Sequence, residues 1–287
     1  MKTAGGMNVH YKKKLNIKNL FVFVILLLGS VLLLIPLWWM ISTSLKSPQE
    51  ILQYPPSFFP KAFHFSNYIE AWKTGNFTRW SLNTLLIAVV STIGNVLVNS
   101  FVAYGFAKIQ FKGRNTLFIL VLSTMLIPGF VTMVPQYILF SKLGWVNTYL
   151  PLIVPAFLGS AFNIFLIRQF MMTIPNDIIE AATIDGASHI RIWWSITMPL
   201  IKPAIITVAI FSFTEAWNDS LGPLLYLSDE NLYTLQLGLQ TFKGSVQTQW
   251  NYLMAMSVMV LIPTVLIFFI FQRYFIKGSN LSAGMKG

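Results

Sequence analysis

The chain contains 287 residues, of which 55% are hydrophobic and only 10% are charged, and its mean hydropathy is +0.64. Soluble domains usually carry about 25% charged residues, so this composition excludes an ordinary soluble protein and makes a lipid bilayer the natural solvent. The formal net charge of +11 does not indicate nucleic-acid binding, because the basic residues form short clusters between apolar runs. The absence of cysteine excludes disulfides, zinc ribbons and thiol catalysis.

Long apolar runs follow one another along the chain. A helix needs roughly 20 mostly apolar residues to cross a bilayer, and an open strand edge cannot be satisfied in lipid. We therefore predict an all-α, polytopic helical membrane protein that forms a single domain over residues 1–287. About six transmembrane helices are expected, at residues 20–41, 81–107, 115–141, 143–167, 204–227 and 250–272.

The first apolar run follows a cluster of lysines, Lys12 to Lys14 and Lys18, which is also the layout of a secretory signal peptide. Its apolar stretch is longer than that of such a peptide, and Pro36 to Trp39 stands where a small-residue cleavage site would be. We expect a retained membrane helix, with cleavage as the alternative.

The basic residues predict the orientation of the chain. With the N-terminus in the cytoplasm, six spans place fourteen of the twenty Lys and Arg residues in inner segments and six in outer segments. The positive-inside rule therefore predicts that both termini lie on the cytoplasmic side of a bacterial cell membrane. Five tryptophans then fall near outer helix ends, as an aromatic belt would place them: Trp38, Trp39, Trp80, Trp145 and Trp250.

Two of the outer segments are long. The first begins with several prolines and therefore as irregular chain, but Phe65 to Trp72 has the pattern of a short amphipathic helix with Ser66 as its N-cap. The second, Ser228 to Gln249, is polar. We expect it to fold over the outer mouth of the helices.

One long inner segment, residues 175–203, predicts two short helices joined by a turn. Pro175 suits the first turn of a helix, and Asp177 and Glu180 place negative charge near its positive end. Gly186 permits a tight turn. A second helix, about residues 188–197, is expected to end where Pro199 and Pro203 break the chain.

This elbow has little side-chain bulk, because Ala181, Ala182, Gly186 and Ala187 are all small. A surface of small residues lets another backbone come close, so the elbow suits insertion into a groove of a partner. The alternative is a compact loop that packs on its own helices. The residue types alone leave both interpretations open.

A specific spacing resembles the loop motif of ABC importer permeases. Glu180-Ala181-Ala182 is followed after two residues by Asp185-Gly186-Ala187, and later by Pro199. The resemblance implies that this loop is a coupling helix, which sits in a cleft of a separate ATPase subunit.

Further residues are similar to the carbohydrate-uptake branch of this family, and among its members to the smaller permease subunit of the maltose transporter. The resemblance covers nearly the whole chain, and it implies that the tail, residues 273–287, reaches the ATPase dimer interface. The residues that carry it are Asn67-Tyr68, Ile127-Pro128, Pro135, Trp217-Asn218-Asp219, Gln272 to Phe275, Lys277-Gly278 and Gly284 to Gly287.

The sequence contains no Gly-x-x-x-x-Gly-Lys-Ser/Thr motif, so no P-loop is expected to cradle phosphate. We predict no catalytic residues and no enzyme activity in this chain. His10, His64 and His189 lack metal-ligand spacing. No metal or cofactor is therefore expected on this chain, and the family resemblance places ATP and magnesium in the partner ATPase.

Two acidic residues, Glu215 and Asp219, lie inside the predicted fifth span. They are four residues apart and share a helix face, and Glu215 falls near the middle of the membrane. Such residues are candidates for a translocation path, to which Trp217 would add a stacking face and Asn218 an amide. The alternatives are a polar lock between helices, or a span that ends early and leaves Asp219 at the interface.

The resulting hypothesis is a permease subunit of an ATP-driven importer that moves a sugar or oligosaccharide by alternating access. The resemblance implies a second permease subunit, an ATPase dimer at the cytoplasmic face and an extracytoplasmic solute-binding protein. Most sugar contacts in the maltose relative belong to the larger permease. The alternatives are an ion-coupled carrier that uses Glu215 and Asp219, and an intramembrane hydrolase, for which no paired nucleophile and base is present.

Overall fold

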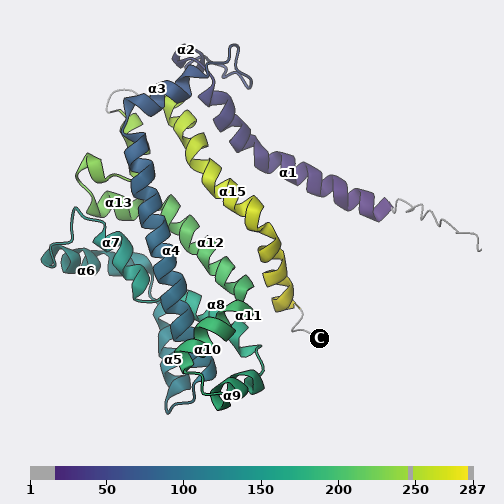
Figure 1. Ribbon diagram of the computed structural model, residues 1–287. Helices are drawn as coiled ribbons and strands as arrows, with labels where there is room; N and C mark the ends of the chain where they lie inside the picture. Colours follow the sequence, from purple (N-terminus) through teal and green to yellow (C-terminus); the bar gives the residue numbers. More distant parts are fainter. Residues whose placement is uncertain (1–16, 245–247, 284–287) are drawn as a thin grey trace, which may run out of the picture.

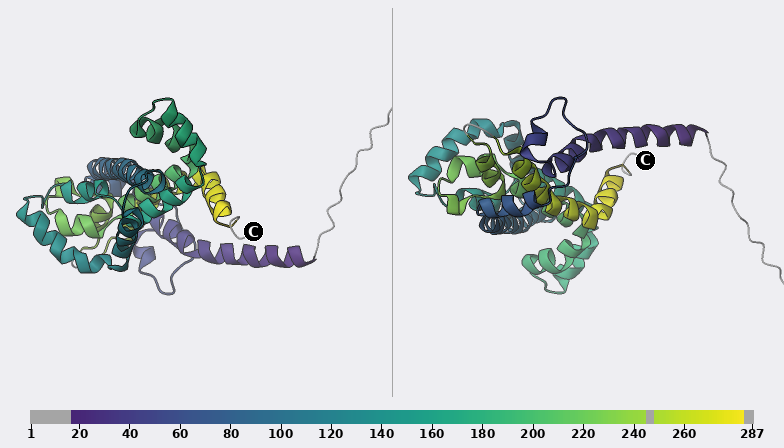
Figure 2. Two further views of the ribbon diagram at one scale, coloured as in Figure 1. Left: turned by 90° about the horizontal axis from the view of Figure 1, so that it is seen from below. Right: turned by 90° about the horizontal axis from the view of Figure 1, so that it is seen from above.

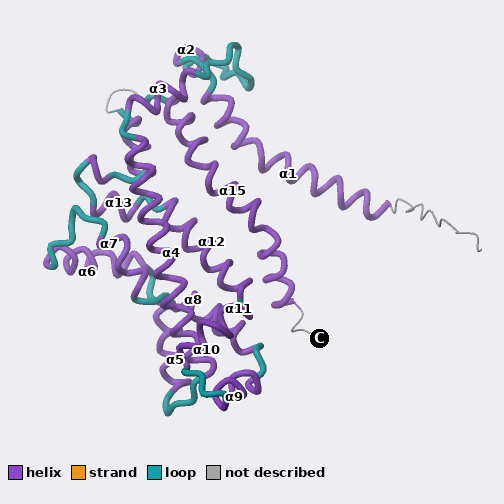
Figure 3. The backbone as a smooth tube through the Cα atoms, in the orientation of Figure 1, coloured by secondary structure: helices purple, strands orange, loops and turns teal. Residues whose placement is uncertain are grey.

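The computed structural model describes residues 17–244 and 248–283, and side chains beyond Gln272 are not described. These residues form helices, and they contain no strand apart from one isolated bridge between Lys243 and Thr248, as expected for an all-α protein. Loops are confined to the ends and breaks of the helices (Figure 3). The α-helices are α1 (Ile17–Ser44), α2 (Pro48–Ile51), α3 (Ser66–Thr74), α4 (Phe77–Lys108), α5 (Arg114–Ser123), α6 (Gly129–Lys142), α7 (Leu150–Ile153), α8 (Ala161–Met172), α9 (Asn176–Ile184), α10 (His189–Ile192), α11 (Met198–Leu200), α12 (Lys202–Asn218), α13 (Leu221–Tyr226), α14 (Leu235–Leu239) and α15 (Trp250–Ala283).

Four helical segments are long and apolar enough to cross a membrane: Asn19–Ser44, Phe77–Lys108, Leu150–Met172 and Trp250–Gln272. Two further pairs of helices pass the same test, but each pair is bent, by 95° between Leu126 and Gly129 and by 86° at Ile201. Within the described residues the number of spans is six if each bent pair is one span, in line with the predicted number. Of the predicted C-terminal tail, residues 273–283 continue α15 as helix, and residues 284–287 lie outside the described residues.

In three of the expected spans, the helices begin, end or break at residues that the apolar runs did not predict. The run at 115–141 divides at Pro128, which has no backbone N–H to donate and forces Ile127 into an extended conformation (ψ 113°). The run at 143–167 becomes helical only from Leu150, after a turn in which Gly144 has φ +69°. The run at 204–227 is interrupted at Asp219, where the backbone is extended between α12 and α13.

Helix α4 is the central element of the body, with α12 and α8 packed along it (Figure 1). Small buried residues on α4, such as Ala88, Ser91 and Ala103, let these neighbours approach closely. Towards α9, side chains from α4, α8, α10 and α12 form one apolar core. Its members include Tyr104, Ile167, Met171, Ile192, Ala204 and Val208, each no more than 1% exposed.

The end of the molecule that carries α2 and α3 is called the outer end here, and the end that carries α9 the inner end, in keeping with the predicted orientation (Figure 1). At the outer end, residues 228–244 fold against α4. Trp80 is only 1% exposed there, and its Nε1 donates a hydrogen bond to Glu230 O at 2.9 Å. Trp80 is therefore a core residue that fixes this cover and not part of an aromatic belt. The ring packs directly on the backbone of Gly238, where no side chain would fit.

A buried group of hydrogen bonds joins α1, α3 and α15 at the outer end. Asn67 Nδ2 donates to Ser44 O at 2.8 Å and to Lys46 O at 3.0 Å, and Asn67 Oδ1 accepts from Asn251 Nδ2 at 3.0 Å. Asn67 is 4% exposed, so this one amide ties three segments that are far apart in the sequence. Helix α3 begins at Ser66 without a side-chain cap, so the predicted capping role of Ser66 is wrong.

Lys46 lies in the same region, just beyond the end of α1, and is 2% exposed. Its Nζ donates to Ser57 O and lies 4.6 Å from the ring centroid of Trp39. Burial lowers the pKa of Lys46, and the charge of Glu50 partly offsets this by raising it. The lysine and the asparagine together hold the irregular outer segment onto the helices.

Helix α1 leaves the body, which it contacts through α15 at its outer end (Figures 1 and 2). Its apolar residues from Leu20 to Ile35 are exposed on every side, with Leu33 80% exposed. An apolar helix of this length requires cover from lipid or from another subunit.

The Asn67→Ala variant is expected to lower the thermal unfolding midpoint of the detergent-purified protein by about 5 °C. The substitution removes three buried hydrogen bonds and leaves the Asn251 amide without its acceptor, at a cost of roughly 1 to 3 kcal/mol. Scanning fluorimetry measures the midpoint. Asn76→Ala is the matched control, because Asn76 is exposed and its side chain makes no cap hydrogen bond; equal shifts in both variants would contradict the buried role.

Candidate functional site

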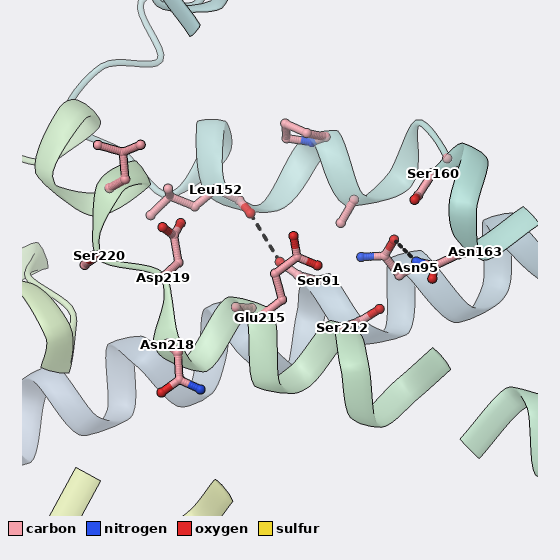
Figure 4. A pocket seen from close by; sticks show the side chains of 15 residues that line it. Ser91, Asn95, Leu152, Ser160, Asn163, Ser212, Glu215, Asn218, Asp219 and Ser220 are labelled. Carbon is pink, nitrogen blue, oxygen red and sulfur yellow. Dashed lines mark hydrogen bonds between the residues drawn. The ribbon is translucent and has the colours of Figure 1, made fainter. Parts of the chain in front are cut away.

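A polar cavity of about 550 Å³ opens between α4, α12 and the segment that joins α7 to α8, which contains a 3-10 turn, Val154–Phe157 (Figure 4). It lies halfway along an otherwise apolar body. Hydroxyl, amide and carboxylate groups dominate the labelled side chains that reach it. Its lining residues are Ser91, Asn95, Leu152, Pro155, Ala156, Gly159, Ser160, Asn163, Ser212, Glu215, Ala216, Asn218, Asp219, Ser220 and Leu221.

Both predicted membrane acids line this cavity. Glu215 lies on α12, and its carboxylate points towards the segment that carries Leu152 (Figure 4). Asp219 does not continue the helix face as expected: it follows the last residue of α12, and its Oδ1 accepts a hydrogen bond from Gly222 N at 3.0 Å. The two carboxylates are thus brought to one cavity by a break in the span and not by helical spacing alone.

The end of the cavity opposite Asp219 is built from amides and hydroxyls that were not singled out in the sequence. Asn163 Nδ2 donates to Asn95 Oδ1 at 3.5 Å. Ser212, one turn before Glu215 on α12, is 3% exposed, and its Oγ has no hydrogen-bond partner among the described residues. The signal that could have found these residues is polarity itself, since amides inside apolar spans are costly unless they serve a purpose.

Trp217 and Asn218, the other two residues of the predicted path, do not offer their polar groups to the cavity. Trp217 is 5% exposed, stacks on Phe213 and donates from Nε1 to Val260 O at 3.0 Å, so it packs against α15. Asn218 Nδ2 turns back to Thr214 O at 2.8 Å, and its side chain points away from the two carboxylates (Figure 4).

The inner elbow has the predicted order of helix, turn and helix. Helix α9 buries Ile179 and Ala182 against the core and exposes Glu180 and Ala181. The turn passes through Gly186 with φ +80°, a conformation that strains residues with a side chain.

The second arm of the elbow starts with α10, where Ser188 Oγ accepts from Arg191 N at 3.4 Å. A π-helical turn, Trp193–Thr197, then leads into α11. Pro199 is exposed inside α11 and does not break the chain; the 86° bend lies two residues later, at Ile201.

The elbow therefore packs through one face and presents the other. Five of the seven predicted docking residues are exposed, namely Glu180, Ala181, Asp185, Gly186 and Pro199, and Ala187 is half-buried. Ala182 is the exception, because it belongs to the core cluster. The exposed small residues leave this surface free of bulk.

Polar contacts attach the elbow to the inner end of α4. Lys108 Nζ donates to Ile174 O at 2.6 Å and to Asn176 Oδ1 at 2.9 Å, directly before and at the start of α9. On the second arm, His189 Nδ1 and Tyr104 Oη lie 3.1 Å apart in a hydrogen bond. Both arms are thus held by side chains of the same helix.

Residues 96–279, which include the elbow and all the cavity-lining residues except Ser91 and Asn95, match the family model described as "Binding-protein-dependent transport system inner membrane component". The chain belongs to this family. It is a multi-pass membrane component of such a transport system, and its family relatives are permease subunits and not enzymes. The match confirms the predicted resemblance to ABC importer permeases.

Two named relatives of this permease align with it over nearly its whole length. It is 33% identical over 261 residues to the arabinooligosaccharides transport system permease protein AraQ of Bacillus subtilis (strain 168), covering 90% of this chain and 92% of the relative. It is 31% identical over 268 residues to the sn-glycerol-3-phosphate transport system permease protein UgpE of Pectobacterium atrosepticum, covering 91% and 95%.

A solved structure shares the fold. The permease matches a chain of a bacterial ABC transporter involved in the import of the acidic polysaccharide alginate with a TM-score of 0.80, covering 92% of this chain and 99% of that chain. Sequence identity is 24%, so the likeness shows a common arrangement of helices.

The Lys108→Met variant is expected to loosen α9, because it removes the charged donor that holds Ile174 and Asn176. Backbone amides of α9 should exchange with deuterium roughly tenfold faster, since a hydrogen bond from a charged group contributes about 1.5 kcal/mol or more. Hydrogen-exchange mass spectrometry measures this. Lys112→Met is the control, as Lys112 is exposed in the neighbouring loop; unchanged protection in Lys108→Met would contradict the anchoring role.

Proposed function

We propose that this permease forms one half of a membrane pore that moves a sugar or oligosaccharide by alternating access. The observation that carries the proposal is the cavity of about 550 Å³, which places amides, hydroxyls and two carboxylates inside an apolar body. Sugars are recognised through their hydroxyls by such groups. The printed function of AraQ, the transport of arabinooligosaccharides, supports a carbohydrate as the cargo.

The energy is proposed to come from a separate ATPase dimer that binds the inner elbow. The sequence contains no P-loop, so ATP and magnesium would be held by that partner and not by this chain. The exposed face of Glu180, Ala181, Asp185 and Gly186, with Pro199 on the second arm, is small enough to enter a groove. Anchoring by Lys108 and Tyr104 would pass a pull on the elbow directly to α4.

The remaining partners follow the same scheme. A second permease would close the open side of the cavity and cover α1. The outer segment 228–249 would meet a solute-binding protein, and both termini would lie in the cytoplasm, as the distribution of basic residues predicts. The alternative, an ion-coupled carrier, rests on Glu215 and Asp219 and would transport without any ATPase.

The Glu180→Lys variant is expected to reduce uptake and substrate-stimulated ATP hydrolysis by at least about tenfold. The reversed charge and longer side chain would oppose entry of the elbow into the ATPase. Both rates are measured in proteoliposomes that contain the whole complex, and membrane insertion of the variant should be unchanged.

Gln110→Lys provides the matched control, because Gln110 is exposed in the loop between α4 and α5 at the same inner end. It adds a positive charge outside the exposed face of Glu180, Ala181, Asp185 and Gly186 and should leave both rates near those of the wild type. Normal stimulated ATP hydrolysis in Glu180→Lys would contradict docking at the elbow. Uptake in vesicles that lack the ATPase would favour the ion-coupled carrier.

A further inference from the structure

The cavity wall carries formal negative charge and no basic side chain. Glu215 and Asp219 are its two acids, and none of the fifteen lining residues, all of which the structure describes, is Lys, Arg or His. A wall of one sign in a low-dielectric surrounding focuses the field across the space that it encloses.

This charge is not neutralised within the described part of the chain. The Glu215 carboxylate accepts no hydrogen bond and makes no ion pair there, although it is exposed to the cavity. Asp219 accepts one hydrogen bond, from the uncharged amide of Gly222. A structural lock between helices would pair such groups, so their field is directed at whatever occupies the cavity.

The opposite end of the cavity offers neutral hydrogen-bonding groups. The buried Ser212 hydroxyl has no partner among the described residues, and it points to the side where Asn95 and Asn163 lie (Figure 4). A buried polar group without a partner is costly. A sugar hydroxyl in the cavity would satisfy it, because a hydroxyl can both donate and accept.

We propose that this wall selects uncharged oligosaccharides, with Glu215 and Asp219 as the residues that exclude uronate- or phosphate-bearing ones. The selectivity deepens the proposed function and rests on it. Specificity here comes from repulsion of the wrong solute, while the amide and hydroxyl end binds the right one. A negative charge brought beside two carboxylates is disfavoured in the same way as a like-charge pair at an interface.

This chain contains no cysteine, so a single thiol introduced into it reports the field when its modification is followed by mass spectrometry of this chain. Ser220→Cys places a thiol in the cavity wall, and Gln240→Cys places one on the exposed outer surface. The purified complex in non-ionic detergent is treated with a cationic methanethiosulfonate (trimethylammonium) and an anionic one (sulfonate) of similar size. The ratio of the two reaction rates, divided by that at Gln240→Cys, reports the potential of the cavity.

The normalised cation-to-anion ratio at Ser220→Cys is expected to be about tenfold or more at low salt, and to fall as salt is added. Adding Glu215→Gln and Asp219→Asn, which keep the side-chain shapes, should bring the ratio close to one. A ratio near one in the Ser220→Cys protein, or a ratio that both amide substitutions leave unchanged, would overturn the proposal. ATP-dependent uptake of trigalacturonate by the wild-type complex would also overturn it.

These outcomes separate the selectivity from the proposed function. A normalised cation-to-anion ratio near one, in a complex that imports sugar, would refute the charge selectivity but would still support sugar import. A tenfold ratio in a complex that shows no ATP-dependent import would support the negative wall and refute the importer.

Discussion

Hydrocarbon offers a peptide group no hydrogen-bond partner, and this constraint decides where the helices of this permease can break. Between α7 and α8 the helix changes to a 3-10 turn, Val154–Phe157, and then breaks. Side chains of α4 bond both sides of this change: Ser91 Oγ donates to Leu152 O, in α7, at 3.3 Å, and Asn99 Oδ1 accepts from Ser160 N at 2.6 Å. Part of this backbone lines the cavity, at Pro155, Ala156, Gly159 and Ser160. The polar cavity and the break between α7 and α8 therefore occur at the same place in the fold.

Helix α4 connects this cavity to the inner elbow. Asn95 lies on the cavity wall and Lys108 holds the start of α9, thirteen residues later on the same uninterrupted helix, which is about 20 Å of rigid rod. Tyr104 holds the second arm from between them. These two hydrogen-bonded contacts connect a displacement of the elbow to the helix that shapes the cavity.

The sequence predicted elements that depend on local chemistry and missed those that depend on packing. The turn at Gly186 and the start of α9 after Pro175 follow from backbone conformation and were predicted. The direction in which the Trp217 side chain points was not predicted. Lipid and protein core are equally apolar, so the sequence pattern of α12 does not tell which side of the helix faces α15. The break at Asp219 has a local signal instead, because its carboxylate accepts from the backbone N–H of Gly222, three residues later at the start of α13.

The Glu215 carboxylate has a consequence for biosynthesis. Glu215 lies three residues before the end of α12, and a carboxylate that must enter the bilayer adds a cost to the insertion of an isolated helix, so α12 gains from entering beside protein. Chains emerge from the ribosome N-terminus first, and the helices that pack on α12, α4 and α8, come earlier in the sequence. Asn95 and Asn163, on α4 and α8, are thus already in the membrane when α12 is synthesised. The order of the helices along the chain therefore allows Glu215 to enter beside polar protein groups instead of lipid alone.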